Sequence, residues 1–315
     1  MGKLAFLYAG QGSQQTGMGQ EFYQTCPEFR EVFNRVQLDF DLKETCFDNP
    51  DNRLKDTRFT QPAMVAYACG VTELLKRRDI QPDLVGGLSL GEYSALYAAG
   101  VWTLEDTMKI ISCRANAMAD ASEGIASAMI AVTGLCQTEL EACCEKAASV
   151  GMVSLCNLNC PGQIVIGGEK AAVEEAARLA REAGARRCIP LPVSGPFHTV
   201  LMKPAANALK SFFETVRFKT PGVEIVYNVL GGPNTDGEPI QDLLVRQVMS
   251  PVKMQACLEY MLRAGVDSFI EIGPGNTLQG LVRKLANEKG IPLDAIRIVS
   301  INSPCDVSAV EELRN

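Results

Sequence analysis

One serine of this sequence stands in a pattern that can expose it as a nucleophile. Residues 87–91 read Gly-Leu-Ser-Leu-Gly, which matches G-x-S-x-G with Ser89 at its centre. An apolar run at 84–88 precedes the serine, and a helical pattern at 92–99 follows it. A sharp turn from strand to helix projects such a serine into solvent, and small neighbours avoid clashes there. The pattern alone is common, so an ordinary turn is the alternative.

A serine hydroxyl is a weak nucleophile until a base takes its proton, and this chain contains a single histidine. That histidine, His198, ends the sequence Gly-Pro-Phe-His at 195–198. A structural histidine in a loop is the alternative interpretation. No aspartate or glutamate nearby plainly completes a triad, and a backbone carbonyl can orient the ring equally well. One histidine also excludes multi-histidine metal sites.

A glycine-containing loop, Gly-Gln-Gly-Ser-Gln at 10–14, follows the first apolar run at 4–9. Glycine permits a loop whose N–H groups point inward, which is what an oxyanion hole requires. A phosphate-binding loop is disfavoured, because position 15 is Gln15 where G-x-G-x-x-G needs glycine, and the lysine of a P-loop is absent.

Arg114 lies in an apolar helical stretch at 110–118. An arginine in such a helix usually extends its charged head to the surface. If the head is buried instead, it needs an anion, and a bound carboxylate can accept two parallel hydrogen bonds from it.

The order of the expected elements predicts an α/β fold that a second unit interrupts. Apolar runs at 4–9 and 84–88 are typical of buried strands, and helical patterns occupy 15–38 and 92–99. Another helix is expected to open at Thr60-Gln61-Pro62, with Pro62 near its first turn, and helical spacing continues at 63–76. Strand, helix, strand, strand, helix and strand follow at 128–135, 138–148, 152–157, 163–167, 171–183 and 187–193, which is the ferredoxin-like order. Helix and strand then alternate again at 201–216, 224–229, 252–264, 268–272 and 277–287. We expect a discontinuous large domain of residues 1–122 and 196–315, and an inserted small domain of residues 123–195.

Composition narrows the class of protein. The chain has 315 residues, of which 47% are hydrophobic and 21% charged, and this excludes a disordered chain. Its net charge of −7 disfavours a nucleic-acid partner, and no apolar run approaches the about 20 residues that span a membrane. Its twelve cysteines form no C-x-x-C pair. We therefore expect a reduced cytoplasmic protein that binds neither nucleic acid nor membrane.

Together these residues resemble the malonyl-CoA:acyl carrier protein transacylase family of fatty acid synthesis, over essentially the whole chain. The motifs that carry the resemblance are GQGSQ at 10–14, TQPA at 60–63, GLSLGE at 87–92, Arg114, NLNCPGQ at 157–163, GPFH at 195–198, Asn228 and EIGPG at 271–275. The resemblance implies an α/β-hydrolase-like large domain that holds an inserted ferredoxin-like small domain. That architecture agrees with the order of elements above.

The resemblance also implies which residues perform the chemistry. Ser89 would be the nucleophile and His198 its base. The backbone N–H groups of Gln11 and Leu90 would form the oxyanion hole. Gln247, through its main-chain carbonyl, would orient His198 in place of an acidic residue.

Other residues would bind the acyl group. By resemblance, Arg114 would hold the free carboxylate of a malonyl group, and Gln61, Met118 and Phe197 would lie in the same pocket. Without substrate, water or a pocket amide such as Gln61 would contact the guanidinium. The family often has histidine directly before the serine, where this chain has Leu88. That departure leaves the base unchanged, because the base in the family is the later histidine.

The activity implied is ping-pong transfer of a malonyl group from malonyl-CoA to the phosphopantetheine thiol of acyl carrier protein, through a malonyl ester on Ser89. The enzyme would act as a monomer, with no metal and no cofactor beyond the CoA thioester, which is a substrate. Three alternatives remain open. They are a serine esterase, a non-catalytic module that binds carrier protein, and an acyltransferase that uses another acyl-CoA, as in polyketide synthesis. The Phe197 ring favours malonyl, because it leaves little room for an α-methyl branch.

Overall fold

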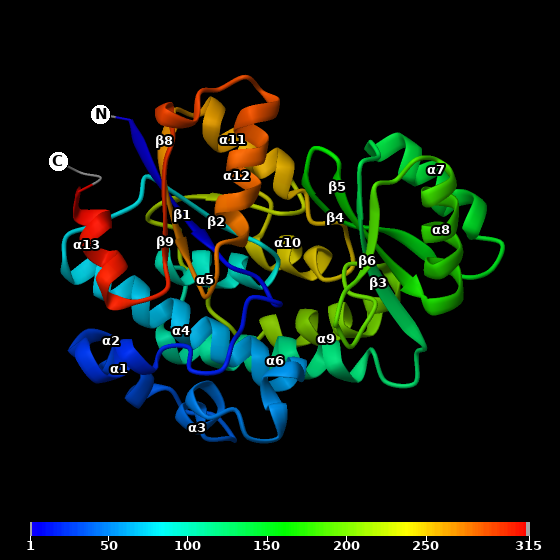
Figure 1. The fold of residues 1–315 in the computed structure, drawn as a ribbon. Coiled ribbons are helices and arrows are strands. Elements are labelled where there is room, and N and C mark those ends of the chain that lie inside the picture. The colour runs from blue at the N-terminus through cyan, green and yellow to red at the C-terminus, as the bar shows by residue number, and fades with distance from the viewer. Residues whose placement is uncertain (1, 313–315) are drawn as a thin grey trace.

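The computed structural model describes residues 2–312, which form two lobes (Figure 1). The larger lobe is built on a five-stranded parallel sheet of order β7-β2-β1-β8-β9. These strands are β1 Lys3–Tyr8, β2 Leu84–Gly87, β7 Glu224–Val226, β8 Val266–Ile272 and β9 Arg297–Ile301. Because β1 and β2 are neighbours and parallel, the loops that follow them meet at one edge of the sheet, where open α/β sheets bind their ligands.

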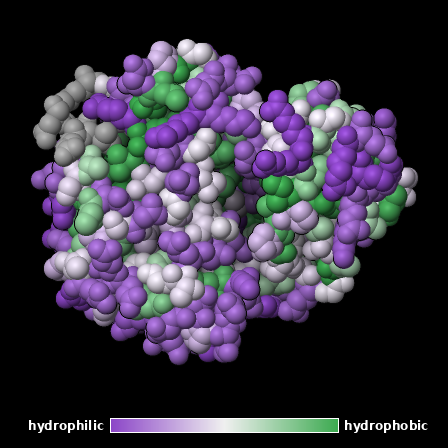
Figure 2. Space-filling view, viewed as in Figure 1, coloured by the Kyte–Doolittle hydropathy of each residue, from purple (hydrophilic) through white to green (hydrophobic). Residues whose placement is uncertain are grey.

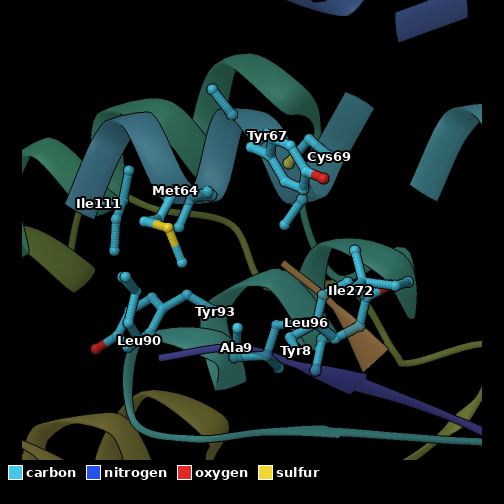
Figure 3. Close-up of a cluster of buried hydrophobic side chains, with 14 of the residues drawn as sticks. Tyr8, Ala9, Met64, Tyr67, Cys69, Leu90, Tyr93, Leu96, Ile111 and Ile272 are labelled. Carbon is cyan, nitrogen blue, oxygen red and sulfur yellow. The ribbon is translucent and has the colours of Figure 1, made fainter. Parts of the chain in front are cut away.

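Helices cover both faces of this sheet. Alternate residues of β1 point to opposite faces: Phe6 and Tyr8 join the core beneath α4, α5 and α6, and Ala5 and Leu7 join the core beneath α11 and α12. The helices of the larger lobe are α1 Gln20–Thr25, α2 Pro27–Arg35, α3 Leu42–Phe47, α4 Thr57–Arg77, α5 Leu90–Ala98, α6 Leu104–Asp120, α9 Lys203–Phe213, α10 Ile240–Gln247, α11 Met254–Arg263, α12 Thr277–Glu288 and α13 Pro304–Glu312, with short 3-10 turns η1 Pro50–Lys55, η2 Val200–Met202 and η3 Leu293–Ala295. Figure 3 shows aromatic and aliphatic side chains from α4, α5, α6, β1 and β8 meeting in the first of these cores.

The smaller lobe, green in Figure 1, is an antiparallel sheet of order β4-β5-β3-β6 with two helices packed against it. Its elements are β3 Ser127–Thr133, α7 Gln137–Ala147, β4 Val153–Cys160, β5 Gln163–Glu169, α8 Lys170–Glu182 and β6 Arg187–Pro190. The predicted fold class, a parallel α/β domain with an inserted ferredoxin-like unit, is therefore confirmed. The limits of the insertion at 123 and 195 stay a prediction.

Several predicted elements differ in extent. Helix α4 begins at Thr57, because Asp56 caps it by accepting the N–H of Arg58 at 2.8 Å, so Pro62 lies within the helix and not in its first turn. Strand β7 ends at Val226 and not at 229, since Tyr227 turns back to bridge with Gly232. The single helical stretch expected at 15–38 is two helices, α1 and α2. Elements α3, α10, β9 and α13 were not predicted.

The glycines on either side of Ser89 let α5 approach the sheet closely. A Cβ atom on Gly91 would lie 2.0 Å from the carbonyl oxygen of Tyr8, and one on Gly87 would lie 2.2 Å from the carbonyl carbon of Gly91. Both clashes are with backbone, which cannot rotate away. Glycine at these positions is therefore a packing requirement of the turn that carries Ser89.

We expect Gly91→Ala to destabilise the protein by more than the about 1–3 kcal/mol typical of overpacking, because its methyl group meets the backbone of β1. Gly280→Ala is the matched control, since Gly280 lies in α12 with nothing within 4 Å of an added Cβ, and it should stabilise the protein by about 0.4–1 kcal/mol. Urea unfolding monitored by circular dichroism measures both. Equal stability of Gly91→Ala and wild type would contradict the close approach.

Candidate active site

Ser89 occupies a strained turn between β2 and α5. Its backbone angles are φ 53° and ψ −96°, outside the regions that serine ordinarily adopts, and such strain persists only where the surroundings enforce it. The Ser89 N–H donates to Asn228 Oδ1 at 2.7 Å. The predicted turn that exposes a serine between strand and helix is therefore present, and its side chain lines a pocket.

His198 lies within hydrogen-bonding distance of that serine. Its Nε2 is 2.6 Å from Ser89 Oγ, and its Nδ1 is 2.8 Å from the main-chain oxygen of Gln247. A carbonyl only accepts, so Nδ1 carries the proton, and in the neutral ring Nε2 accepts from the serine hydroxyl. Burial, and then the charge of Arg114, lower the pKa of the imidazole to about 4. The ring is therefore neutral at pH 7 and free to accept a proton.

Arg114 extends from α6 into the same site with only 1% of its surface exposed. Its Nη2 donates to Ser89 Oγ at 3.1 Å and to Gln247 Oε1 at 3.2 Å, and its guanidinium carbon lies 4.9 Å from the centre of the Tyr93 ring. Its Nε has no hydrogen-bond partner, and no carboxylate within residues 2–312 forms an ion pair with it. The buried carboxyl of Glu92 interacts with the guanidinium through charge but makes no ion pair with it. A buried cation that lacks a paired carboxylate suits a site that receives one.

The amide that contacts Arg114 belongs to Gln247, whereas the sequence suggested Gln61. Gln61 is buried, but its Nε2 donates to Gln11 Oε1 at 3.2 Å and to Met118 Sδ at 3.5 Å. The distinction depends on α10, an unpredicted helix whose last residue is Gln247. The Gln247 side chain also donates from Nε2 to the carbonyl oxygen of Ser89 at 2.9 Å, so one residue contacts the serine, the histidine and the arginine.

The side chains of Ser89, His198 and Arg114 line a pocket of about 140 Å³ between the lobes. The larger lobe contributes Gly10, Gln11, Gln61, Leu88, Ser89, Arg114, Met118, Phe197 and His198, and the smaller lobe, with the segment that leaves it, contributes Met129, Asn157, Asn159, Val165, Leu191 and Val193. Figure 2 shows the surface hollowed between the two lobes. The predicted pocket residues Gln61, Met118 and Phe197 thus lie together, and the contributions of Asn157 and Asn159 were not predicted individually.

Gln11 and Leu90 follow the neighbouring strands β1 and β2. No hydrogen bond of their backbone N–H groups is found to any residue within 2–312. The loops that carry them approach closely, since a Cβ on Gly10 would lie 2.7 Å from the carbonyl oxygen of Leu88. Two unpartnered N–H groups beside the serine are what an oxyanion hole needs, and their assignment to that role stays a prediction.

Two residues at the base of the turn had no predicted role. Glu92, in the first turn of α5, is fully buried, and Asn228 follows β7. Both lie in motifs of the family resemblance, but a charged residue early in a helix is usually at the surface, and nothing local in the sequence signals its burial.

Residues 2–312 contain no group of three or more His, Cys, Asp or Glu side chains arranged to hold a metal ion. No helix in this range is long and apolar enough to cross a membrane. All twelve cysteines are unpaired thiols, and most are buried.

Residues 5–299 match the family model described as the acyl transferase domain. The malonyl CoA-acyl carrier protein transacylase of Bacillus subtilis (strain 168) is 41% identical over 288 residues, which cover 90% of this chain and 91% of that protein. The crystal structure of malonyl CoA-acyl carrier protein transacylase from Clostridium perfringens ATCC 13124 matches with a TM-score of 0.92 and 37% identity, over 99% of this chain and 97% of that one. A malonyl-transacylase solved in complex with a type II polyketide synthase acyl-carrier protein matches with a TM-score of 0.92 and 34% identity, over 98% and 99% of the two chains.

The geometry predicts an unusual pH dependence for the reaction of Ser89 with a fluorophosphonate. Protonated imidazole cannot accept the serine proton, and a lowered pKa means that this protonation occurs only in more acidic solution. Labelling should therefore stay nearly constant from pH 8 to about 5.5 and fall to half near the His198 pKa of about 4.

Short labelling pulses followed by intact mass measure this profile, with far-ultraviolet circular dichroism at each pH as the control for folding. Ser89→Ala should take no label. Arg114→Met should move the midpoint to higher pH, because it removes the positive charge that contributes to the lowered pKa. A wild-type midpoint at the ordinary histidine value of about 6.5 would contradict the assignment.

Proposed function

This chain belongs to the acyl transferase domain family, as its motifs predict, and on this premise we propose that it transfers malonyl from malonyl-CoA to the phosphopantetheine thiol of acyl carrier protein in fatty acid biosynthesis. The observation that carries the proposal is the buried guanidinium of Arg114, which lies beside a Ser89–His198 pair and forms no ion pair with any carboxylate of residues 2–312. A pocket with this pair handles an acyl group, and the cation selects one that carries a negative charge.

The first half-reaction forms an ester on Ser89. The Ser89 oxygen bonds to the thioester carbonyl carbon while its proton passes to His198 Nε2, at the end of the 2.6 Å contact. The N–H groups of Gln11 and Leu90 stabilise the oxyanion. The carbon–sulfur bond then breaks, and the proton moves from His198 to the departing CoA sulfur.

The second half-reaction reverses these steps with a different thiol. The phosphopantetheine thiol gives its proton to His198, and its sulfur bonds to the carbonyl carbon of the ester on Ser89. The bond to Ser89 then breaks, and the proton returns to the serine oxygen. Water has to be kept from the ester meanwhile, and the position of Ser89 in a small pocket between two lobes supports this. The similar malonyl-transacylase solved with its acyl-carrier protein supports the choice of acceptor.

Arg114 links the choice of acyl group to the reactivity of the base. A carboxylate bound to the guanidinium offsets the positive charge that helps to lower the pKa of His198. Proton transfer to His198 then becomes easier with a malonyl group than with an acetyl group in the same pocket. Malonyl is therefore favoured both in binding and in the attack on its thioester.

The alternative activities fit the site less well. A serine esterase has no use for a buried arginine beside its nucleophile. A non-catalytic carrier-binding module has no use for a serine–histidine contact of 2.6 Å. A bulkier branched acyl group would meet Phe197, a residue that is 6% exposed and lines the pocket.

The cofactor requirement and the location of the protein are also proposals. Every step above uses side chains and backbone of this chain, so we propose that the reaction needs no cofactor beyond the CoA thioester itself. We propose a cytoplasmic location, which the twelve unpaired cysteines support, since reduced thiols are typical of that compartment.

Mixing the enzyme with malonyl-CoA should give one malonyl adduct on Ser89 by intact mass, and Ser89→Ala should give none while remaining folded. His198→Ala should slow adduct formation by about 10²- to 10⁴-fold, the usual effect of removing a general base. Rapid quench followed by mass spectrometry measures the rate. A malonyl adduct on another residue of Ser89→Ala, or a near-normal rate in His198→Ala at pH 7, would overturn these assignments.

Substitution of Arg114 tests the acyl preference. Arg114→Ala should lower kcat/KM for malonyl-CoA steeply and raise the relative acceptance of acetyl-CoA, because the pocket loses its cation. Arg114→Lys should restore only part of malonyl transfer, since a point charge cannot reproduce two parallel hydrogen bonds. The measurement is the ratio of kcat/KM for malonyl-CoA to that for acetyl-CoA in all three proteins. A ratio unchanged in Arg114→Ala would show that this arginine is structural.

A further inference from the structure

Glu92 is a buried carboxyl group that the mechanism above does not use. It lies in the first turn of α5, three residues after Ser89, and none of its surface is exposed. Its Oε2 accepts the backbone N–H of Asn228 at 2.6 Å, a contact between residues 136 positions apart in the chain. Its Oε1 has no hydrogen-bond partner, and within residues 2–312 it forms no ion pair. Burial of a carboxyl group with an unpartnered oxygen lowers the stability of the fold, so such a group calls for an explanation in terms of function.

Asn228, the residue that Glu92 holds, contacts the reactive turn on both sides of Leu88. Its side chain accepts the N–H of Ser89 at Oδ1 and donates from Nδ2 to the carbonyl oxygen of Gly87, each at 2.7 Å. Its own carbonyl oxygen accepts the N–H of Lys253 at 2.9 Å. The Asn228 side chain therefore fixes the strained backbone of Ser89, while its main chain is fixed by Glu92 and by the segment before α11.

The hydrogen bond of Glu92 is with Asn228 and not with a residue that lines the substrate pocket, and Glu92 interacts with the pocket residue Arg114 only through charge. Neither Glu92 nor Asn228 is among the residues that line the pocket. Burial raises the pKa of Glu92 to about 8, although the N–H of Asn228, Arg114 and Gln247 oppose that rise. Both protonation states are thus populated near neutral pH, and in both an oxygen accepts from Asn228. The task of Glu92 depends on that oxygen and not on its charge.

We propose that Glu92 is a positioning residue for acyl transfer, which acts through Asn228 to hold the Ser89 turn in the geometry from which its oxygen attacks the thioester. This inference rests on the proposed function of Ser89. Without the Glu92 oxygen, Asn228 loses a fixed backbone position and the Ser89 turn can relax toward ordinary angles. The serine oxygen then moves relative to His198 Nε2, and the cost falls on the chemical step.

The proposal predicts a division between kcat and KM. The Arg114 guanidinium and the pocket walls do not depend on Glu92 for a hydrogen bond, and Glu92, with a pKa of about 8, is mostly uncharged at pH 7, so binding of malonyl-CoA should change little. Misplacement of reacting atoms by about 1 Å lowers rates by as much as about 10²-fold. We therefore expect Glu92→Leu to slow acylation of Ser89 by about 10- to 100-fold at saturating malonyl-CoA, with KM within about twofold of wild type.

Conservative replacement and a double-mutant cycle complete the test. Glu92→Gln keeps an oxygen that accepts from Asn228, so it should recover acylation to within about threefold of wild type. Asn228→Ala should slow acylation as Glu92→Leu does, and the double variant should be no slower than the slower single variant, because both substitutions break one chain of contacts. Rapid quench and intact mass give each rate, corrected for the folded fraction. Glu92→Met provides the same comparison if Glu92→Leu does not fold.

Glu271→Leu is the matched control for loss of a buried carboxyl. Glu271 is fully buried and accepts the N–H groups of Leu278 and Gln279 at the start of α12, away from the pocket lining. Its loss should lower the melting temperature while the acylation rate of the folded fraction stays near that of wild type.

Three results would overturn the positioning role. They are a normal acylation rate in folded Glu92→Leu, a Glu92→Gln as slow as Glu92→Leu, and strictly additive losses in the double variant. Each can occur while wild type still forms its malonyl adduct on Ser89. Absence of that adduct in wild type would instead defeat the proposed function itself.

Discussion

The backbone strain of Ser89 is the constraint on which the rest of the site depends. A non-glycine residue with φ 53° and ψ −96° is held there by its neighbours and not by its own preference. Glycines at 87 and 91 allow α5 to contact the end of β1 through backbone, and Asn228 supplies hydrogen bonds on both sides of Leu88. The same turn directs the serine side chain toward His198 and leaves the N–H of Leu90 without a partner. The exposure of the expected nucleophile and the unpartnered N–H of the expected oxyanion donor therefore both result from this one enforced conformation.

Gln247 connects this turn to the base and to the cation. Its main-chain oxygen fixes the tautomer of His198, its Oε1 accepts from Arg114, and its Nε2 donates to the carbonyl oxygen of Ser89. A triad acid would add a second negative charge to a pocket that is proposed to receive a carboxylate. A neutral amide residue orients the histidine without that charge. Within residues 2–312 no acidic side chain contacts His198, which is consistent with a substrate that is itself an anion.

Sequence patterns predicted the features that depend on local order. Strand, turn and helix around Ser89 were predictable from periodicity and small residues, and the single histidine left one choice of base. The unpredicted features come from contacts between distant segments. The sequence around Glu92 is typical of a surface residue, and its burial depends on its contact with Asn228, 136 positions later. The position of the Gln247 side chain depends on α10, and the eight residues of that helix are too few for a periodic pattern to predict it. His198 has a φ of 63°, in the left-handed region, and no feature of the neighbouring sequence predicts that conformation for a histidine.

The arrangement makes selectivity and reactivity difficult to separate. Arg114 contacts the nucleophile, shares Gln247 with the base, and contributes to the low pKa of His198, so any change to the cation changes all three. A pocket that recognised malonyl through a peripheral arginine would bind the acyl group without changing how readily the serine attacks its thioester. In the proposed reaction, the charge that attracts the carboxylate also restrains proton transfer until a carboxylate offsets it. On that proposal, the short distance between the guanidinium and the serine oxygen favours the carboxylate-bearing thioester in the transition state as well as in the bound state, which is the condition for raising kcat and not only lowering KM.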